Sequence, residues 1–372
     1  MLDWLVNMAN ERTKLQINMK KIAVLVSGGV DSSVVLSLLK EQGCDVEAFY
    51  LKIWLEDELS YLASCPWEED LGYIQKICDS LSVKLHVISM QETYWQKVVA
   101  YTIAQVRAGC TPSPDILCNE FVKFGAFFDV IGDVYDAVAT GHYAQREDRD
   151  GVAFLKCAKD PIKDQTYFLS RLSQEQLKRS IFPIGHLLKS EVRLAAERLA
   201  LPNKNRKDSQ GICFLGKFKF SDFIKHHVGT KQGDLVEFET GKKLAEHEGF
   251  WFYTLGQRKG IGLGGGPWFV VSKDTSRNIV YISRDYYAQD KQRTAFIATD
   301  CRWISGVVPS GKCRVKIRHS EQFDDALISF KNEEKTVLHV TLSKSDQGIA
   351  PGQFAVFYQD DYCLGAGVIV DE

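Results

Sequence analysis

Residues 22–39 read IAVLVSGGVDSSVVLSLL, and this segment predicts the architecture of the first half of the chain. Its first five residues are apolar and mostly β-branched, which is typical of a buried strand in a parallel sheet. The apolar residues from Val34 to Leu39 fit a buried helix that ends near Gly43. The small residues between them therefore form a tight turn from strand to helix.

This turn has the composition of an anion-binding loop. Gly28 and Gly29 let the backbone turn sharply and approach a polyanion closely. The N–H groups and the dipole of the following helix favour a negative charge there. Asp31 fits such a loop when a divalent cation bridges its carboxylate to phosphates. The loop lacks the Gly-Lys-Ser/Thr of a Walker A loop. It resembles the SGGxDS pyrophosphate loop of N-type ATP pyrophosphatases, which adenylate a substrate oxygen and release pyrophosphate.

Composition limits the other possibilities. The chain has 372 residues, enough for about two or three domains. Its formal net charge is −2, so binding to nucleic acid would use local basic patches. No apolar run approaches the roughly 20 residues that span a bilayer, so we expect no membrane association. The short apolar stretch near the N-terminus, residues 2–6, does not predict a secretory signal.

The cysteines indicate a reducing compartment. They stand at positions 44, 65, 78, 110, 118, 157, 213, 301, 313 and 363. None forms a Cys-x-x-Cys pair, so we predict no zinc or other protein-held metal site. We expect most of them to be buried as small hydrophobes in a cytoplasmic protein, or in a plastid protein as the alternative.

Strands and helices alternate in the first half, which predicts an α/β domain with a parallel sheet. We expect strands at 46–51, 84–88 and 137–140 and helices at 70–81, 91–107, 174–178 and 189–199. Ligands of such sheets lie beyond the carboxyl ends of the strands. The loop at 27–32, Leu51 and Gly141 would share that edge.

The second half of the chain is richer in glycine and in short predicted strands. Residues 256–267 are too rich in glycine for a regular element. Short strands are expected at 278–282, 314–318, 325–330, 336–342, 354–358 and 365–370, a spacing that predicts a small closed β-barrel. We therefore predict a catalytic domain at 21–210, a glycine-rich central domain at 211–280 and a barrel at 281–372.

Two further strings contain candidate nucleophiles. Residues 111–119 read TPSPDILCN, where two prolines stiffen the loop and Asp115 stands three residues before Cys118. A neighbouring base can deprotonate a thiol, whose thiolate is the nucleophile. Residues 207–214 read KDSQGICF and place Cys213 in a polar loop. Either cysteine alone is more often structural, and the functional interpretation depends on the pair.

Several motifs together resemble one family. The strings SGGVDSS, TPSPDILCN, ATGHYA, KDQTYFLS, KDSQGICFLG and YTLGQRKGIGLGG occur in the order typical of tRNA-specific 2-thiouridylases. The resemblance runs from about Lys21 to the C-terminus. It implies an adenine nucleotide alpha hydrolase-like first domain. It also implies ATP-dependent thiolation of C2 of the wobble uridine, position 34, in the tRNAs for Lys, Glu and Gln.

The resemblance also implies roles for individual residues. Cys118 matches the nucleophile, Cys213 the persulfide-carrying cysteine and Asp115 the acid/base. The ATP contacts match Leu25, Val26, Ser27, Gly28, Gly29, Val30, Asp31, Ser32, Leu51 and Gly141, with Mg²⁺ held through the ATP phosphates. The tRNA contacts match Ser113, Pro114, His142, Lys163, Asp164, Gln165, Arg318, His319 and Gln353. A cysteine desulfurase or a sulfur-relay protein would supply the sulfur.

The chain departs from the family pattern at two places. Many members have Gly/Ala-Met where this chain has Leu25-Val26, and many have Asn where it has Ser113. Serine can donate or accept a hydrogen bond to the target base but has a shorter reach than asparagine. The implied relay requires the Cα atoms of Cys118 and Cys213 to come within about 7 Å in some conformer.

Basic residues could bind the RNA. Arg314, Lys316 and Arg318 alternate along one predicted strand and would share a solvated face. Arg206 and its neighbours Lys204 and Lys207 precede Cys213, and the glycine-rich loop contains Arg258 and Lys259. With an RNA substrate these groups would contact phosphates.

Two other functions fit part of the sequence. An amidating ligase of the same superfamily would use the loop but would need neither cysteine. A catalytically inactive tRNA-binding protein would keep the fold without releasing pyrophosphate. Intact Asp31, Asp115 and both cysteines favour the sulfurtransferase.

Overall fold

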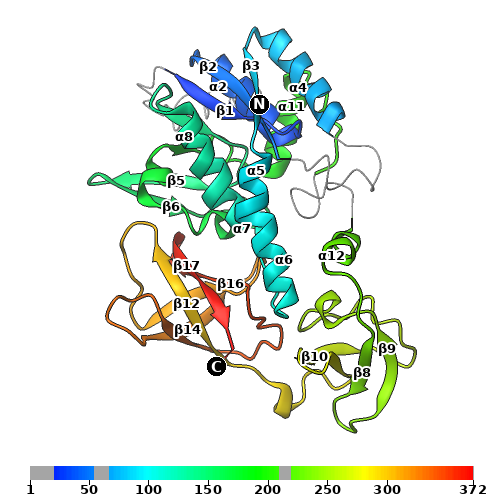
Figure 1. Cartoon of the computed structure of the whole chain (residues 1–372). Coiled ribbons are helices and arrows are strands. Elements are labelled where there is room, and N and C mark those ends of the chain that lie inside the picture. Colours follow the sequence, from blue (N-terminus) through cyan, green and yellow to red (C-terminus); the bar gives the residue numbers. More distant parts are fainter. Residues whose placement is uncertain (1–20, 54–66, 209–218, 372) are drawn as a thin grey trace.

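The computed structural model of the chain describes residues 21–53, 67–208 and 219–371. Within these ranges lie a helix-covered parallel sheet, a small four-stranded sheet and a closed barrel (Figure 1). The first region lies at the top of that view, with the barrel and the small sheet side by side beneath it. None of the helices in the described ranges is both long and apolar enough to cross a membrane.

The parallel sheet has five strands. In spatial order they are β3 (Leu85–Ser89), β2 (Val46–Lys52), β1 (Ile22–Leu25), β4 (Ala137–Ala139) and β7 (Ser180–Ile181). The predicted strands at 22–26, 46–51, 84–88 and 137–140 are confirmed, whereas the two-residue β7 was not predicted. The chain leaves β1 toward β2 and β3 and returns on its other side as β4. The ends of β1 and β4 therefore form the switch point where ligands of open α/β sheets bind.

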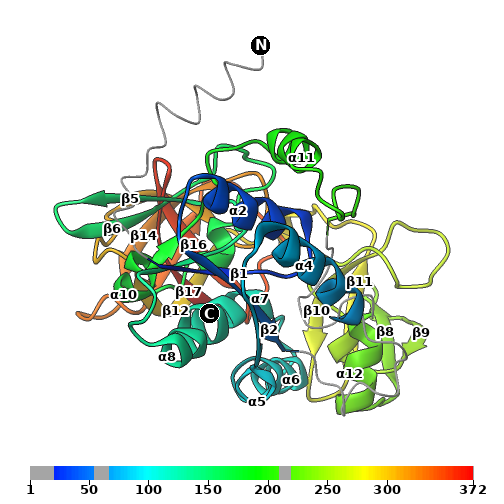
Figure 2. The same cartoon turned by 90° about the horizontal axis from the view of Figure 1, so that it is seen from above.

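Helices cover both faces of this sheet. Alternate residues of β1 enter two separate buried clusters, Ala23 and Leu25 in one, Ile22 and Val24 in the other. The second cluster is covered by α2 (Val30–Glu41), α4 (Trp67–Leu81) and α11 (Lys189–Arg198). Figure 2 shows α2, α4 and α11 together on one side of β1 and β2.

The first cluster is covered by two longer helical runs, each with a π-helical part. One consists of α5 (Gln91–Tyr94), η2 (Trp95–Val99) and α6 (Ala100–Arg107). The other consists of α7 (Pro114–Leu117), η3 (Cys118–Ala126) and α8 (Phe127–Ile131). The predicted helices at 70–81, 91–107, 174–178 and 189–199 are confirmed, with α10 (Gln174–Lys178) matching its expected bounds. The short α9 (Thr166–Leu169) was not predicted.

A carboxylate at the start of β2 links the sheet to its surroundings. Glu47 accepts hydrogen bonds from His86 Nε2 at 2.5 Å and from the Tyr135 hydroxyl at 2.7 Å, and it pairs with Lys21 Nζ at 2.8 Å. Burial alone would raise the pKa of Glu47, but these hydrogen bonds lower it to about 2. Glu47 is therefore ionised near neutral pH.

The central region is a small sheet with α12 (Phe220–Val228) beside it. Its strands, in spatial order, are β10 (Phe269–Asp274), β11 (Ile279–Ser283), β8 (Gly233–Glu237) and β9 (Lys243–His247). Residues 256–267 contain no helix or strand, as predicted. The strand expected at 278–282 belongs to this sheet and not to the barrel, which corrects the prediction. Because β11 continues to Ser283, a domain boundary at residue 280 would cut a strand.

The C-terminal region is a closed barrel, as predicted. Its strands in spatial order are β12 (Ala295–Trp303), β15 (Leu338–Leu342), β14 (Asp324–Phe330), β13 (Lys312–Lys316), β16 (Phe354–Gln359) and β17 (Tyr362–Val370). Pairing of β17 with β12 closes the circle. The long strand β12 was not predicted.

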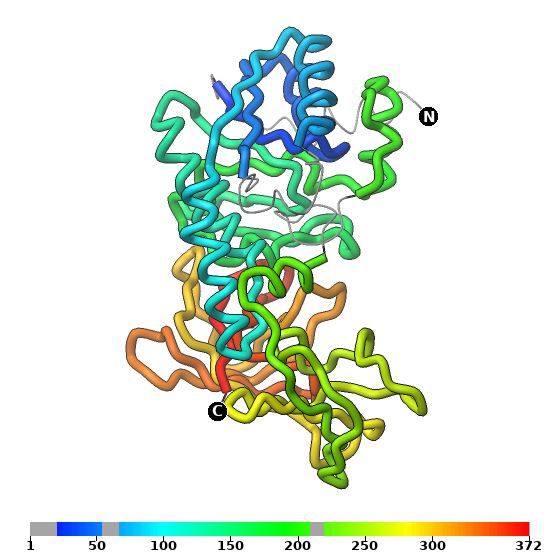
Figure 3. Tube along the Cα trace, turned by 45° about the vertical axis from the view of Figure 1, so that its right-hand side comes forward, coloured from blue at the N-terminus to red at the C-terminus, as the bar shows by residue number. Residues whose placement is uncertain are grey.

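A hairpin from the first half extends the barrel sheet. Its strands are β5 (Gln145–Arg149) and β6 (Val152–Lys156), and β6 pairs with β17 through Tyr362 and Cys363. This hairpin was not predicted, because its partner strand lies about 200 residues later in the sequence. It joins the barrel sheet to the α/β region. In Figure 3 the red C-terminal segment lies directly beneath green segments of the first half of the chain.

Candidate active site and RNA-binding face

The loop between β1 and α2 has a backbone that only glycine accommodates readily. Gly28 has φ 74° and a Cβ there would lie 2.9 Å from the Cα of Asp70. Gly29 is the N-cap of α2, and its carbonyl accepts hydrogen bonds from the Ser32 and Ser33 hydroxyls at 3.2 and 2.9 Å. These contacts hold the first turn of α2 in a fixed position beneath the loop.

A second segment covers the loop from outside. Asn203 Nδ2 donates to the Gly28 carbonyl and to Ser33 Oγ, both at 2.9 Å. Arg206 Nη1 donates to the same carbonyl at 3.0 Å, and its other nitrogen pairs with Asp70 at 2.5 Å. Arg206 therefore belongs to the loop site. The expectation that it contacts tRNA phosphate finds no support in these contacts.

Gly141 lies beside the loop between β1 and α2, at the edge of the sheet where it was expected. A Cβ on this residue would lie 2.9 Å from the Ser32 nitrogen and 3.1 Å from the carbonyl carbon of Asp31. The end of β4 therefore touches the first turn of α2. Leu51, at the end of β2, packs against the buried cluster that contains Leu25 and Cys118.

Asp31 is part of an ion network at the mouth of the loop. Lys189 Nζ contacts its two carboxylate oxygens at 2.7 and 2.9 Å, and the Tyr143 hydroxyl donates to it at 3.0 Å. Lys189 also pairs with Asp208 at 2.8 Å. Asp208 pairs further with Lys163 at 2.8 Å and with Arg193 at 2.5 Å.

Burial alone would raise the pKa of Asp208, but hydrogen bonds from Lys163 and Lys189 lower it to about 2. Burial and the Asp31 carboxylate raise the pKa of Tyr143, so its hydroxyl keeps its proton near neutral pH. Asp208 is therefore ionised near neutral pH, and the Tyr143 phenol is neutral. Lys163, which the resemblance assigned to tRNA, contacts this network.

Cys118 begins the π-helix η3, directly after the short α7 that starts at Pro114. It is 1% exposed. A Cβ on Gly125 would lie 2.9 Å from the Glu120 carbonyl oxygen, which accepts a hydrogen bond from Gln176 Nε2 at 2.9 Å. The wider π-helical turn thus requires a glycine and an outside donor. Such turns are frequent at functional sites.

His142 follows β4 and packs against the same π-helix. Its ring lies 6.0 Å from that of Phe124 and 6.3 Å from that of Phe182, and Nδ1 hydrogen-bonds Thr140 Oγ1 at 2.8 Å. Burial lowers the pKa of His142 well below its usual 6.5, so the ring is neutral. The ring therefore links the end of β4 to the Cys118 helix.

The loop before Cys118 contacts the barrel. The Thr111 nitrogen donates to the Pro351 carbonyl at 2.7 Å, two residues before Gln353. The Tyr167 phenol is hydrogen-bonded to Ser113 and donates to the Phe354 carbonyl at 3.2 Å. Ser113 and Gln353 thus lie on segments that touch.

The barrel residues Arg318 and His319 approach the same place. The His319 ring lies 4.6 Å from that of Phe168, and Nε2 hydrogen-bonds the Asp164 carbonyl at 3.0 Å. Arg318 is exposed and pairs with Asp346 at 2.5 Å. Ser113, Gln353, Arg318 and His319 therefore surround one junction between the α/β region and the barrel.

Lys316 corrects one prediction. It was expected on a solvated face with Arg314 and Arg318, but it is 2% exposed. Its Nζ pairs with the buried Asp164 carboxylate at 3.4 Å and lies 4.3 Å from the Phe323 ring. Asp164 also accepts a hydrogen bond from Thr166 Oγ1 at 2.7 Å. The side chains of Lys316 and Asp164 therefore pair with each other inside the protein.

Comparisons with known proteins agree with this arrangement. Residues 20–217 match the tRNA methyl transferase HUP domain, residues 221–284 the tRNA methyl transferase PRC-barrel domain, and residues 293–369 the aminomethyltransferase beta-barrel domain. The tRNA-specific 2-thiouridylase MnmA of Parabacteroides distasonis is 46% identical over 95% of this chain and 99% of its own length. The chain belongs to the tRNA-specific 2-thiouridylase family. The MnmA of Porphyromonas gingivalis is 45% identical over 94% of this chain and 98% of its own. A solved NMN synthetase from Francisella tularensis aligns over 56% of this chain and 73% of its own at TM-score 0.35 and 16% identity, too distant to bear on function.

In this 2-thiouridylase, Cys213 and residues 209–218 lie outside the described residues. The Cys118–Cys213 relay therefore stays a prediction. The residues that sequence reasoning missed are Asn203, Lys189, Asp208 and Tyr143. Only Tyr143 and Asp208 lie in strings that the resemblance used, so the pattern gave no signal for the other two.

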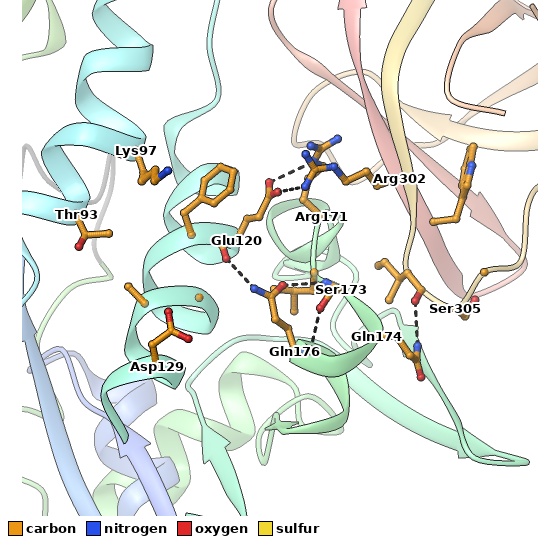
Figure 4. Close-up of a pocket in the computed structure, with 17 residues that line it drawn as sticks. Thr93, Lys97, Glu120, Asp129, Arg171, Ser173, Gln174, Gln176, Arg302 and Ser305 are labelled. Atoms are coloured by element: carbon orange, nitrogen blue, oxygen red, sulfur yellow. Dashed lines mark hydrogen bonds and ion pairs between the residues drawn. The ribbon is translucent and has the colours of Figure 1, made fainter. Parts of the chain in front are cut away.

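A pocket of about 880 Å³ lies between η3 and the barrel strand β12 (Figure 4). Glu120 lies at its wall and pairs with Arg171 at 3.2 Å and with Arg302 at 2.5 Å. Arg171 also pairs with Asp300 at 2.8 Å. In this family member the network ties the Cys118 helix to the barrel, through the buried Glu120 and Arg171 on one side and the exposed Asp300 and Arg302 of β12 on the other.

Proposed function

We propose that this protein is an ATP-dependent tRNA 2-thiouridylase. It adenylates the C2 oxygen of the wobble uridine in the tRNAs for Lys, Glu and Gln and replaces that oxygen with sulfur. The observation that carries the proposal is that one segment contacts both the proposed ATP site and the helix of the proposed nucleophile. The end of β4 touches the anion-binding turn through Gly141 and the Cys118 helix through His142.

The turn between β1 and α2 fits the phosphates of ATP. Gly28 and Gly141 let Asp70 and the end of β4 pack closely around the turn, where a Cβ would lie 2.9 Å from their neighbours. The first N–H groups of a helix such as α2 form an anion-binding site. The proposed ATP contacts are Leu25, Val26, Ser27, Gly28, Gly29, Val30, Asp31, Ser32, Leu51 and Gly141. Asp31 would hold Mg²⁺ together with the phosphates. The cation would stabilise the charge that develops on departing pyrophosphate.

The chemistry follows in three displacements. The C2 oxygen of uridine bonds to the α-phosphorus, and the bond from that phosphorus to the bridging oxygen breaks, which releases pyrophosphate. The terminal sulfur of a Cys213 persulfide then attacks C2, and the C2–O bond breaks with AMP as the leaving group. The Cys118 thiolate attacks the remaining Cys213 sulfur, which leaves the thiocarbonyl on the base and a Cys118–Cys213 disulfide.

The thiol proton and the disulfide of this scheme each need a partner. Asp115 would accept the proton of the Cys118 thiol, since Asp115 stands one helical turn before Cys118. A cellular thiol reductant then reduces the disulfide, and a cysteine desulfurase or sulfur-relay protein reloads Cys213. A reversible disulfide of this kind is catalytic in a compartment that keeps thiols reduced, and we assign the protein to the cytoplasm.

The proposed tRNA face is the junction of the α/β region and the barrel. Ser113 and Pro114 would contact the flipped base, and Arg318, His319 and Gln353 the neighbouring nucleotides. The other proposed tRNA residues are His142, Lys163, Asp164 and Gln165. His142 packs against the Cys118 helix, Lys163 pairs with Asp208, Asp164 pairs with Lys316, and Gln165 accepts a hydrogen bond from the Tyr143 nitrogen. The proposed units are 21–210 for catalysis, a central unit that extends through β11, and the remaining chain for tRNA binding.

The test is nucleoside mass spectrometry. The protein is incubated with unmodified tRNA for Lys, Mg·ATP and a persulfide donor, and the digested tRNA is examined for 2-thiouridine. We expect 2-thiouridine with AMP in equal amounts, its loss in Cys118→Ser and Cys213→Ser, and full activity in the control Cys44→Ser, whose thiol lies in the turn before β2. A ligase would form AMP equally in all variants without thionucleoside. An inactive binding protein would form neither.

A further inference from the structure

Lys189 occupies a position that the proposed chemistry has not used. Its ammonium group has three donors, and the three contacts recorded for it go to Asp31 Oδ1, Asp31 Oδ2 and Asp208 Oδ1 at 2.7, 2.9 and 2.8 Å. The side chain is 15% exposed and lies 5.7 Å from the Tyr143 ring. A flexible side chain is thus held at the mouth of the phosphate loop.

The backbone of Lys189 is fixed independently of Asp31. Its N–H donates to the buried Asp160 carboxylate at 2.9 Å, and the preceding Leu188 N–H donates to Glu191 at 2.6 Å. Helix α11 packs against α2 in the buried cluster beneath the loop. The ammonium would therefore stay near the loop if the Asp31 carboxylate turned away.

The charges around this position are unbalanced. Asp208 contacts three cations, Lys163, Lys189 and Arg193, where one would neutralise it. Asp31 also pairs with Lys189, so three cations face two carboxylates among these paired side chains. The Asp160 carboxylate beside them accepts the backbone N–H groups of Ile162, Lys163 and Lys189. A site that receives a triphosphate and releases pyrophosphate gains from such an excess, because the bound anion supplies the missing negative charge.

We propose that Lys189 is a phosphate-contacting residue, which holds the β- and γ-phosphates of ATP and the departing pyrophosphate. This rests on the proposed function. When the Asp31 carboxylate binds the magnesium ion of Mg·ATP, two donors of Lys189 are released toward the phosphate oxygens. Asp208 keeps the third and acts as a positioning residue, itself held by Lys163 and Arg193.

The test compares the affinities for pyrophosphate and for AMP of proteins with and without Lys189. Binding of inorganic pyrophosphate without Mg²⁺ is measured by calorimetry for the wild type, Asp31→Asn, and Asp31→Asn/Lys189→Met. The Asp31→Asn background removes the carboxylate that Lys189 would otherwise neutralise, so the double variant leaves no unpaired Asp31 charge. A lost charge-assisted hydrogen bond predicts about 10- to 100-fold weaker pyrophosphate binding in the double variant, with unchanged affinity for AMP, which lacks those phosphates.

The matched control is Lys159→Met, another partly exposed lysine, which pairs with Glu191 at 3.0 Å at the start of the same helix. Its pyrophosphate affinity should stay within twofold of the wild type. Equal pyrophosphate affinity with and without Lys189 in the Asp31→Asn background would overturn the inference, as would an equal loss in Lys159→Met. Thermal unfolding first shows whether Asp31→Asn/Lys189→Met is as stable as Asp31→Asn. If the methionine variant is unfolded, Asp31→Asn/Lys189→Arg replaces it; this variant keeps the positive charge and should retain pyrophosphate binding. Failure of the wild type to bind Mg·ATP would instead refute the proposed function itself.

Discussion

Replacing Gly141 by alanine tests the contact between β4 and the phosphate loop. The new Cβ would lie 2.9 Å from the Ser32 nitrogen, 3.1 Å from the Asp31 carbonyl carbon and 3.2 Å from the Ser32 Cα. All three are backbone atoms in the first turn of α2, so no side chain can rotate to make room. Gly141 does not have a positive φ, so the effect is steric.

The magnitude follows from the distances. A Cβ normally stays at least about 3.4 Å from such atoms, so α2 must move away from β4 by several tenths of an ångström. Overpacking of this kind costs about 1–3 kcal/mol. If the movement displaces the N–H groups that bind phosphate, the same cost weakens ATP binding by about 5- to 150-fold, since 1.4 kcal/mol corresponds to tenfold.

The assay is calorimetric titration of Gly141→Ala with Mg·ATP, accompanied by thermal unfolding. The control is Gly72→Ala in α4, where a Cβ meets nothing within 4 Å. Because glycine is about 1 kcal/mol less favourable than alanine inside a helix, the control should be slightly more stable and bind ATP normally. Wild-type ATP affinity in a stably folded Gly141→Ala protein would refute the reasoning that this glycine shapes the phosphate site.

Three other substitutions give separate tests. The free energy of unfolding should fall as the pH drops from 4.5 toward 2, because the pKa of Glu47 is lower in the folded protein and protonation of its carboxylate removes that stabilisation. In urea titrations across this pH range, Glu47→Gln should lose less stability than the wild type. Lys316→Met leaves the buried Asp164 carboxylate unpaired and should lower the free energy of unfolding by about 3–5 kcal/mol, and a loss below 1 kcal/mol would contradict the buried pair. Asn203→Ala removes a buried donor from the Gly28 carbonyl and should weaken Mg·ATP binding about 5- to 100-fold, with unchanged tRNA affinity in filter binding.

Local sequence patterns predicted the elements whose contacts are local or repetitive. The run from Ile22 to Ser33 contains a strand, a turn and a helix start within twelve residues, and both glycines stand where the turn needs them. The barrel strands other than β12 were found because alternation and turn residues recur at short spacing. The closed barrel and the parallel sheet therefore followed from the sequence.

Contacts between distant segments were beyond such patterns. Asn203 reaches Gly28 across 175 positions, and no periodicity links them. Lys316 was misassigned because alternation identifies a face but not what covers it, and here Asp164, Phe323 and Tyr358 cover it. The strand at 278–282 was placed in the barrel because its pattern resembles the barrel strands, while its pairing with β8 and β10 could only come from the fold.

Adenylation of the uridine C2 oxygen is tested most directly by following that oxygen. A tRNA for Lys with ¹⁸O at C2 of the wobble uridine is incubated with the protein, Mg·ATP and a persulfide donor, and the nucleotide products are examined by mass spectrometry. We predict one ¹⁸O atom in the phosphate of AMP for each 2-thiouridine formed, and none in pyrophosphate. Formation of 2-thiouridine with the label in water, or in pyrophosphate, would contradict the mechanism.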